Sequence, residues 1–398
     1  MNRAALEGVR VVDLTRFLAG PYCTMMLADM GAEVLKVEPP GEGDESRAQQ
    51  RYRYDGETAY YVSVNRNKQG LVVDLKHPDG LAVLHDLVRV ADVVVHNFRP
   101  RVAERFGLRY ASLKELNRRI VCCGLTAFGR SGPHADKPAY DLIVQAMGGG
   151  MSITGAPGGA PARMGLPIGD LAGGMFAAFG IVNALLARER TGRGQDVETS
   201  LLAAQIALYT YVAAYYWHSG EVPGPAGSAH ASMVPYQAFP TADGWIAIVA
   251  HTPKFWRNLC GAMGLEALLA DPRFATLEAR LAHREVLIPI LEAEFARKPT
   301  AEWCAILEPA DVPCGRVNTV AQALADPAVL AAGMVQAIEH AKGFRVNVTG
   351  NPVRLSETPG PPLTSPPTLG QHTEQVLREV LGYPPDKVRA LREAGAIA

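Results

Sequence analysis

One aspartate has the surroundings expected of a reactive group in this chain. Asp170 lies in Gly-Leu-Pro-Ile-Gly-Asp-Leu-Ala-Gly-Gly, residues 165–174, between a glycine-rich stretch and a long apolar segment. Glycines leave the backbone slim enough for a bulky ligand to come close. A carboxylate with a pKa near 4 is ionised at neutral pH and can attack a carbonyl group without a neighbouring base. The structural alternative is that Asp170 only caps a helix that begins near Leu171.

Other motifs give weaker signals. Residues 15–21, Thr-Arg-Phe-Leu-Ala-Gly-Pro, together with Glu38, loosely imitate a dinucleotide site but lack the G-x-G-x-x-G fingerprint. The helix after this turn can bind a phosphate at its N-terminus, although an ordinary tight connection explains the turn equally well. No G-x-S-x-G motif for a nucleophilic serine occurs. We expect no metal site, because metal-ligand spacing is absent from His134, His230 and His251.

Basic residues gather near the predicted strand ends. They are Arg16, Lys36, Lys76, Arg99, Arg101 and Arg105. Each one alone is best explained as a solvated surface charge, but several of them, gathered at one edge of a sheet, could reach one polyphosphate. Asn97 and Phe98 follow a predicted strand and offer an amide and an aromatic face to a nucleobase. A phenylalanine of the core is the simple alternative for Phe98.

Composition excludes several classes of protein. The 398 residues suffice for two domains, and a formal net charge of −1 creates no overall field that attracts nucleic acid or anionic membranes. The six cysteines include no C-x-x-C pair and indicate reduced, buried thiols. Two apolar segments, 171–187 and 201–217, are shorter than the roughly 20 residues that a membrane span needs. We expect a cytoplasmic protein that binds neither nucleic acid nor membrane.

The first half of the chain alternates strand and helix signals. Helices are predicted from Pro21 to about Met30 and from Pro78 to about Val90. The predicted strands are 9–14, 32–38, 71–75, 92–96 and 120–125, and a short strand follows the turn at 191–195. This alternation predicts an α/β fold with a parallel, Rossmann-like sheet. Ligands on such sheets bind at the carboxyl ends of the strands, where the basic residues would gather.

The pattern changes after Trp217. A Pro/Gly-rich linker at 220–227 precedes a strand at 245–250 and helices at about 254–263, 279–296 and 300–307, which predict a smaller α+β unit. A Pro-rich stretch at 351–367 and closing helices at 372–382 and 386–394 follow. We therefore divide the chain into a large domain begun by residues 1–219, a small domain at 220–327 and a C-terminal segment at 328–398.

Several stretches, taken together, resemble the family III CoA-transferases. They occur in order over nearly the whole chain, at residues 8–15, 19–21, 27–38, 74–76, 97–98, 192–195 and 369–373. The resemblance implies that Asp170 is the nucleophile and that the C-terminal segment returns to the large, CoA-binding domain. It also implies two ring-like subunits interlocked as a homodimer. No cofactor is expected to stay bound, because the CoA thioester is a substrate.

The resemblance further implies which residues contact the substrates. The CoA contacts map onto Leu18, Ala19, Val73, Lys76, Asn97, Phe98, Arg99, Arg105, Lys137 and Tyr140, and the spacing from 137 to 140 departs from the family by one residue. The glycine run of the oxalate-specific members is absent after Trp217, so we do not expect oxalate or formate. The candidates to bind the second carboxylate of a dicarboxylic substrate are Arg16, Tyr140, Arg163 and His230. An ordinary surface or core role remains open for each of them.

The expected activity is transfer of CoA from an acyl-CoA, such as succinyl-CoA or another dicarboxylyl-CoA, to a small carboxylic acid. Aspartyl anhydride and aspartyl-CoA thioester intermediates would form, with backbone N–H groups of 148–150 and 173–174 as candidate oxyanion donors. One alternative is an α-methylacyl-CoA racemase, whose His–Asp pair is replaced here by Tyr140 and Asp141. Another is a non-catalytic CoA-binding protein, which would not need Asp170.

Overall fold

The structure is a computed structural model that describes residues 4–398, and the chain divides into two compact units. Unit 1 contains the described residues up to Met151, together with 163–221 and 327–398. Unit 2 contains 152–162 and 222–326. Residues 152–162, which we expected in the large domain, therefore cluster with the smaller unit.

A six-stranded parallel sheet lies at the centre of unit 1. Its strands are β1 (Arg10–Asp13), β2 (Glu33–Glu38), β5 (Lys68–Val72), β6 (Val93–His96), β7 (Val121–Thr126) and β8 (Asp196–Ser200). Their order across the sheet is β5-β2-β1-β6-β7-β8, and all neighbours are parallel. This is the strand order of doubly wound sheets, which confirms the predicted α/β class. The order reverses between β1 and β6, so a ligand site is expected at the carboxyl ends of these two strands.

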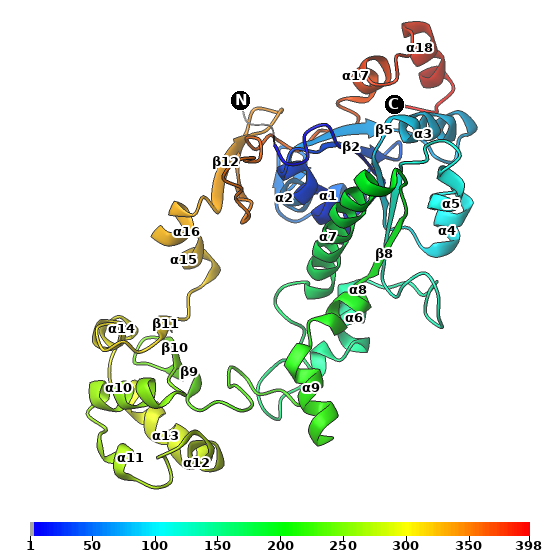
Figure 1. The fold of residues 1–398 in the computed structure, drawn as a ribbon. Helices are drawn as coiled ribbons and strands as arrows, with labels where there is room; N and C mark the ends of the chain where they lie inside the picture. Colours follow the sequence, from blue (N-terminus) through cyan, green and yellow to red (C-terminus); the bar gives the residue numbers. More distant parts are fainter. Residues whose placement is uncertain (1–3) are drawn as a thin grey trace. The chain divides into compact units, whose positions relative to one another are not determined.

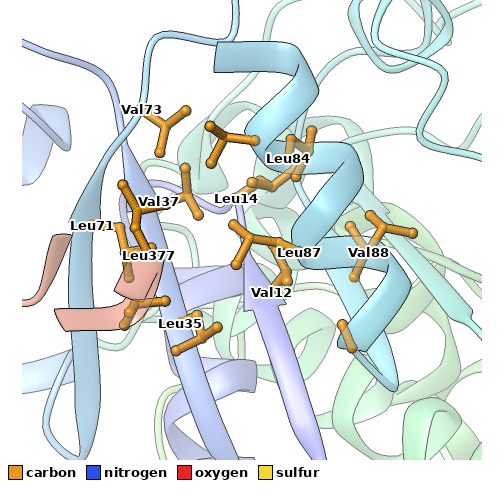
Figure 2. Close-up of a cluster of buried hydrophobic side chains, with 14 of the residues drawn as sticks. Val12, Leu14, Leu35, Val37, Leu71, Val73, Leu84, Leu87, Val88 and Leu377 are labelled. Atoms are coloured by element: carbon orange, nitrogen blue, oxygen red, sulfur yellow. The ribbon is translucent and has the colours of Figure 1, made fainter. Parts of the chain in front are cut away.

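Helices cover both faces of this sheet (Figure 1). Helices α1 (Ala19–Asp29) and α7 (Ile168–Thr191) pack on the face that includes Val11. Helices α3 (Pro78–Val90), α17 (Thr373–Glu379) and α18 (Pro385–Glu393) pack on the face that includes Val12. Figure 2 shows the second face, with Leu84 and Leu87 of α3 against the strands. Because both faces are covered, the central residues of β1, β6 and β7 are buried and mostly apolar.

The C-terminal residues complete the second face of the sheet. The backbone N–H of Val72 in β5 donates to Thr373 Oγ1, at 3.1 Å, and that of Asp74 donates to the carbonyl oxygen of Ala396, at 2.9 Å. Ala396 and Ile397 are buried in the same core cluster as β1 and β2. The end of the chain is therefore part of the core of unit 1.

Helix α7 is longer than its apolar pattern predicted. It has 24 residues, and it is the one helix among residues 4–398 that is long and apolar enough to cross a membrane. This is weak evidence for a span, because core helices of soluble proteins share these properties. A Cβ at Gly174 would lie 2.6 Å from the carbonyl oxygen of Ala19, and one at Gly173 would lie 2.8 Å from Leu201 Cδ2. These glycines therefore let α7 pack closely against its neighbours.

Unit 2 contains a three-stranded antiparallel sheet, β11-β10-β9, and its own helices. Its core includes Phe239, Trp256, Phe295 and Trp303. The elements are β9 (Tyr236–Pro240), β10 (Trp245–Val249), α10 (Pro253–Met263), α11 (Ala267–Ala270), α12 (Leu277–Ala282), α13 (Arg284–Phe295), α14 (Thr300–Leu307), β11 (Cys314–Arg316) and α15 (Val320–Leu324). The helix predicted at 279–296 is broken at His283, which ends α12 and precedes α13.

Shorter elements complete unit 1. They are β3 (Arg53–Tyr54), β4 (Glu57–Thr58), α2 (Ala59–Val64), α4 (Pro100–Arg105), α5 (Tyr110–Leu113), α6 (Asp141–Met147), α8 (Leu201–Ala207), α9 (Thr210–Ser219), α16 (Pro327–Ala331), β12 (Val335–Glu339) and β13 (Arg345–Thr349). The apolar segment 201–217 is thus two helices, α8 and α9.

Candidate functional site

A cleft of about 500 Å³ lies in unit 1 beyond the carboxyl ends of β1, β6 and β7, and Asp170 is part of its wall. Most of the residues proposed from the sequence also line it: Arg16, Leu18, Ala19, Lys76, Asn97, Phe98, Arg99, Arg105, Lys137 and Tyr140. These residues come from five separate stretches of the chain, and the reversal of strand order brings them together. The volume lies in the range of small-molecule sites.

Three predicted site residues do not line this cleft. Val73 is buried and lines a smaller cavity of about 50 Å³, which it shares with Lys76 and Phe98. Arg163 is exposed and is not part of the cleft wall. His230 belongs to unit 2, where its ring packs 5.2 Å from the ring of Tyr236.

The cleft is rich in positive charge. Within the described residues, no acidic side chain forms an ion pair with Lys76, Arg99 or Arg105, so these groups can meet an anionic ligand. Arg16 is already engaged, because its Nη1 lies 2.8 Å from Glu45 Oε1 and its guanidinium lies 5.3 Å from the centroid of the Phe98 ring. A ligand that uses Arg16 must therefore compete with Glu45.

Two of the basic residues noted in the sequence are committed elsewhere. Lys36 is fully buried, and its Nζ lies 2.9 Å from Asp44 Oδ2. Arg101 pairs with Asp136 at 2.9 Å. Neither residue lines the cleft, so the four basic residues of this group that remain available there are Arg16, Lys76, Arg99 and Arg105.

Polar side chains hold the backbone of the loop after β1 through hydrogen bonds. Lys36 Nζ donates to the carbonyl oxygen of Thr15, at 2.8 Å, and the N–H of Phe17 donates to Asp44 Oδ1, at 3.2 Å. Asn97 Oδ1 accepts from the N–H of Arg16 and its Nδ2 donates to the carbonyl oxygen of Arg16. The Asn97 amide therefore holds the protein backbone through one bond at each of its polar atoms, and contact of its remaining N–H and lone pair with CoA stays a prediction.

Phe17 has a backbone φ of 63°, a left-handed conformation that is costly for a bulky residue. Its ring meets that of Tyr140 edge to face, with centroids 5.3 Å apart. Strained residues of this kind persist only where the surroundings hold them, and they cluster at functional sites. The contact between Phe17 and Tyr140 therefore defines one wall of the cleft.

Asp170 is the third residue of α7, which begins three positions before the predicted start. The N-cap position is occupied by Pro167, so Asp170 does not cap its own helix. Burial and the nearby carboxylate of Asp141 raise the pKa of Asp170 to about 7. The expectation of an ordinary carboxylate with a pKa near 4 is therefore wrong, and the group titrates close to neutral pH.

Tyr60, on α2, lines the cleft and was not singled out by the sequence. Burial and the nearby carboxylates, Asp170 foremost, raise the pKa of Tyr60 to about 12. Its hydroxyl thus stays protonated at neutral pH and can donate a hydrogen bond. No local motif marks this residue, because it reaches the cleft only through the tertiary arrangement of α2.

The glycines proposed as oxyanion donors have other roles. Gly173 and Gly174 are buried within α7, where backbone N–H groups are bonded to carbonyl groups of the preceding turn. Gly148 ends α6, and its N–H donates to the carbonyl oxygen of Val144 at 2.8 Å. The expectation of free donors is therefore wrong for these three glycines.

All six cysteines are free thiols. Cys304, Glu308 and Cys314 of unit 2 bring three possible ligand atoms within 4.8 Å of one another, a cluster that the sequence analysis missed. Burial raises the pKa of Cys314 to about 11, although a bound metal would itself deprotonate the thiol. The set lacks the fourth ligand that structural zinc takes. The absence of a metal site stays a prediction.

Comparison with known proteins adds independent information. A family model described as CoA-transferase family III matches residues 6–373. The chain is 39% identical to succinyl-CoA:glutarate CoA-transferase of Mus musculus, over 98% of this chain and 90% of that protein. It is also 39% identical to succinate–glutarate CoA-transferase of Agrobacterium fabrum, over 95% and 96% of the two chains. The crystal structure of a CAIB/BAIF family protein from Brucella suis has a TM-score of 0.85 and 34% identity, and covers 96% of this chain and 100% of that one.

Proposed function

Because this chain belongs to the family III CoA-transferases, we propose that it moves CoA from succinyl-CoA or another dicarboxylyl-CoA to a dicarboxylic acid such as glutarate, with Asp170 as the nucleophile. The observation that carries this proposal is the place of Asp170, a partly buried carboxylate in the wall of a cation-lined cleft. The names of the two relatives support dicarboxylic substrates.

The reaction follows from the chemistry of a carboxylate nucleophile. Ionised Asp170 attacks the thioester carbonyl, and the C–S bond breaks to give a mixed anhydride and the CoA thiolate. The thiolate attacks the aspartyl carbonyl, which releases the donor acid and leaves an aspartyl-CoA thioester. The acceptor carboxylate attacks this thioester, and its C–S bond breaks to give a second mixed anhydride and the CoA thiolate. This thiolate attacks the acceptor's acyl carbonyl, and the C–O bond of the anhydride breaks, which forms the new acyl-CoA and frees the Asp170 carboxylate. Burial of Asp170 favours this sequence, because water would hydrolyse each intermediate.

The cleft offers distinct partners for the two ends of the substrate. We assign the phosphates of CoA to Lys76, Arg99 and Arg105, which have no acidic partner among the described residues. The second carboxylate of the acyl group is assigned to Arg16 and Tyr140, which line the same cleft as Asp170. Roles for Val73, Arg163 and His230 stay predictions, as does a cytoplasmic location.

A homodimer would cover the outer face of α7. Met175, Phe179, Val182 and Leu186 are exposed along this helix, and Trp217 of α9 is 79% exposed. Large exposed apolar side chains in a row are typical of association surfaces. We therefore assign this face of α7 to contact between two copies of the chain, while the interlocked form stays a prediction.

The two alternative functions have less support. The Tyr140–Asp141 pair lacks a histidine, and both carboxylate oxygens of Asp141 accept hydrogen bonds, so it is poorly placed to exchange an α-proton. A non-catalytic CoA-binding protein would have no need of a carboxyl group with a pKa near 7 in its cleft.

Mass spectrometry of CoA exchange tests the proposal. Succinyl-CoA with glutarate should yield glutaryl-CoA and succinate with little net hydrolysis. Asp170→Ala should lose this exchange and still bind CoA. Exchange at the wild-type rate in Asp170→Ala would refute the role of Asp170. Deuterium uptake at the α-carbon of a 2-methylacyl-CoA, without exchange, would favour the racemase instead.

A further inference from the structure

The N-terminus of α7 is capped by a side chain from another helix. Its own N-cap residue, Pro167, makes no side-chain hydrogen bond. Instead, Asp141 Oδ1 accepts from the N–H of Gly169, at 2.8 Å, and from the N–H of Asp170, at 3.3 Å. Helix N-termini leave N–H groups without partners inside the helix, and an oxygen at this place satisfies them. The first residue of α6 thus does what a capping residue of α7 would ordinarily do.

Gln145 fixes the other oxygen of Asp141. It lies one turn further along α6, and its Nε2 donates to Asp141 Oδ2 at 2.6 Å. Its Oε1 accepts from the N–H of Met164, at 2.8 Å, so it also holds the segment that leads into α7. Gln145 is fully buried and Asp141 is 6% exposed. Both oxygens of Asp141 are therefore held in one orientation.

A glycine at position 169 makes room for this contact. A Cβ at Gly169 would lie 3.1 Å from Asp141 Oδ1 and 3.4 Å from Val144 Cγ1. The first distance is tighter than ordinary van der Waals contact, so a side chain here would require the Asp141 carboxylate to shift by a few tenths of an ångström relative to the N–H groups that it caps. The glycine before Asp170 is thus explained by close approach of a carboxylate from its own chain.

We propose that Asp141 is a positioning residue that caps α7 from α6 and thereby holds the backbone and side chain of Asp170 in the orientation for attack. This inference rests on the proposed function, since it assigns to Asp170 the role of nucleophile. The hydrogen bond to the N–H of Asp170 acts directly on the residue whose carboxylate must meet the thioester carbonyl. Misplacement of a reacting group by about 1 Å can cost about 100-fold in rate.

Asp141 also acts on the charge of Asp170. It occupies the N–H groups that would otherwise stabilise a carboxylate in the first turn of a helix, and it adds a second negative charge. Two titratable groups from other elements influence this site: Asp141 from α6, and Tyr60 from α2, whose raised pKa keeps it neutral. The cations of the cleft are retained in every variant below. Removal of the Asp141 charge should therefore lower the pKa of Asp170.

Two substitutions separate the capping hydrogen bonds of Asp141 from the negative charge of its carboxylate. Asp141→Asn keeps an oxygen that can accept from the N–H groups of residues 169 and 170, and loses the charge together with the hydrogen bond from Gln145 Nε2, because the asparagine NH2 group is a donor. Gly169→Ala keeps the charge and displaces the carboxylate. Asp141→Ala loses both. Glu189→Gln is the control, because it removes an exposed carboxylate near the far end of α7.

The experiment measures the rate of CoA exchange against pH, together with CoA affinity and circular dichroism. We expect kcat to fall about 10- to 100-fold in Asp141→Ala with little change in CoA affinity. The acid limb of the pH profile should move to lower pH in Asp141→Asn and Asp141→Ala. In Gly169→Ala the acid limb should stay near pH 7, while kcat falls. If Asp141→Ala does not fold, the other two variants decide.

Wild-type rates and unmoved acid limbs in the folded variants would overturn the inference. This outcome differs from failure of the proposed function, in which the wild type lacks exchange or Asp170→Ala retains it. Only the positioning role would be refuted if the wild type is active, Asp170→Ala is inactive, and the variants at Asp141 and Gly169 keep the wild-type rate and acid limb.

Discussion

Replacement of Asp170 with asparagine should make the protein more stable while it removes the nucleophile. The wild-type carboxylate must ionise in a partly buried place beside Asp141, and its pKa rises from the ordinary 3.8 to about 7. At about 1.4 kcal/mol per pKa unit, charging this group lowers the free energy of unfolding by at most about 4 kcal/mol. Because relaxation and water entry reduce such values, we expect a gain of about 1–3 kcal/mol in Asp170→Asn.

The gain must depend on pH in a defined direction. Between pH 3.8 and about 7 the folded wild type holds a proton that the unfolded chain has lost, so wild-type stability falls as pH rises through this window. The difference between Asp170→Asn and wild type should be largest at pH 8 and should shrink towards pH 4. Urea denaturation at pH 8, 6.5 and 5 measures it, with Glu189→Gln as the control. A variant that is less stable than wild type at pH 8, or a difference independent of pH, would refute the reasoning.

Two further predictions concern the frame of the site and its outer surface. Asp44→Ala should lower the free energy of unfolding by about 3–5 kcal/mol, because it removes the ion-pair partner of the fully buried Lys36 ammonium. Urea denaturation measures this change. Glu42→Ala, at an exposed position, is the control and should change the stability little. Phe179→Asp should convert a dimer to monomers in light scattering after size exclusion, because it places a charge at the centre of the exposed apolar face of α7. A monomeric wild type, or a variant that stays dimeric, would contradict the assigned surface.

The parallel sheet could be predicted because its strands are buried on both faces. Val11 and Val12 point into opposite core clusters, so two successive residues at the centre of the strand are apolar. Strand β5 was placed three residues too late, since Lys68 and Gln69 interrupt an apolar run. Lys68 is buried nevertheless, because its Nζ lies 3.0 Å from Asp13 Oδ2 on β1. A single sequence does not reveal a charge partner that is 55 positions away.

The site was predictable in its composition and less so in its chemistry. Asp170 and the cations around it stand out through their types and through their places after predicted strands. The raised pKa of Asp170 could not be predicted, because it depends first on burial and then on Asp141, which precedes it by 29 positions and meets it only when α6 packs on α7. The same holds for Tyr60. The hydrogen bonds between the Asn97 amide and the backbone of Arg16 could not be predicted either, because the two residues are 81 positions apart.

The way in which the end of the chain completes the sheet constrains when the protein can fold. Residues 373–397 cover β5 and α3, and the small unit lies between them in the sequence. During synthesis, the apolar face shown in Figure 2 therefore stays partly exposed while residues 222–326 of unit 2 are translated. Unit 2 has a core of its own and can fold in that interval, but the core of unit 1 is complete only after residues 373–397 have left the ribosome. This delay makes the nascent large unit a natural client for chaperones that bind exposed apolar surface.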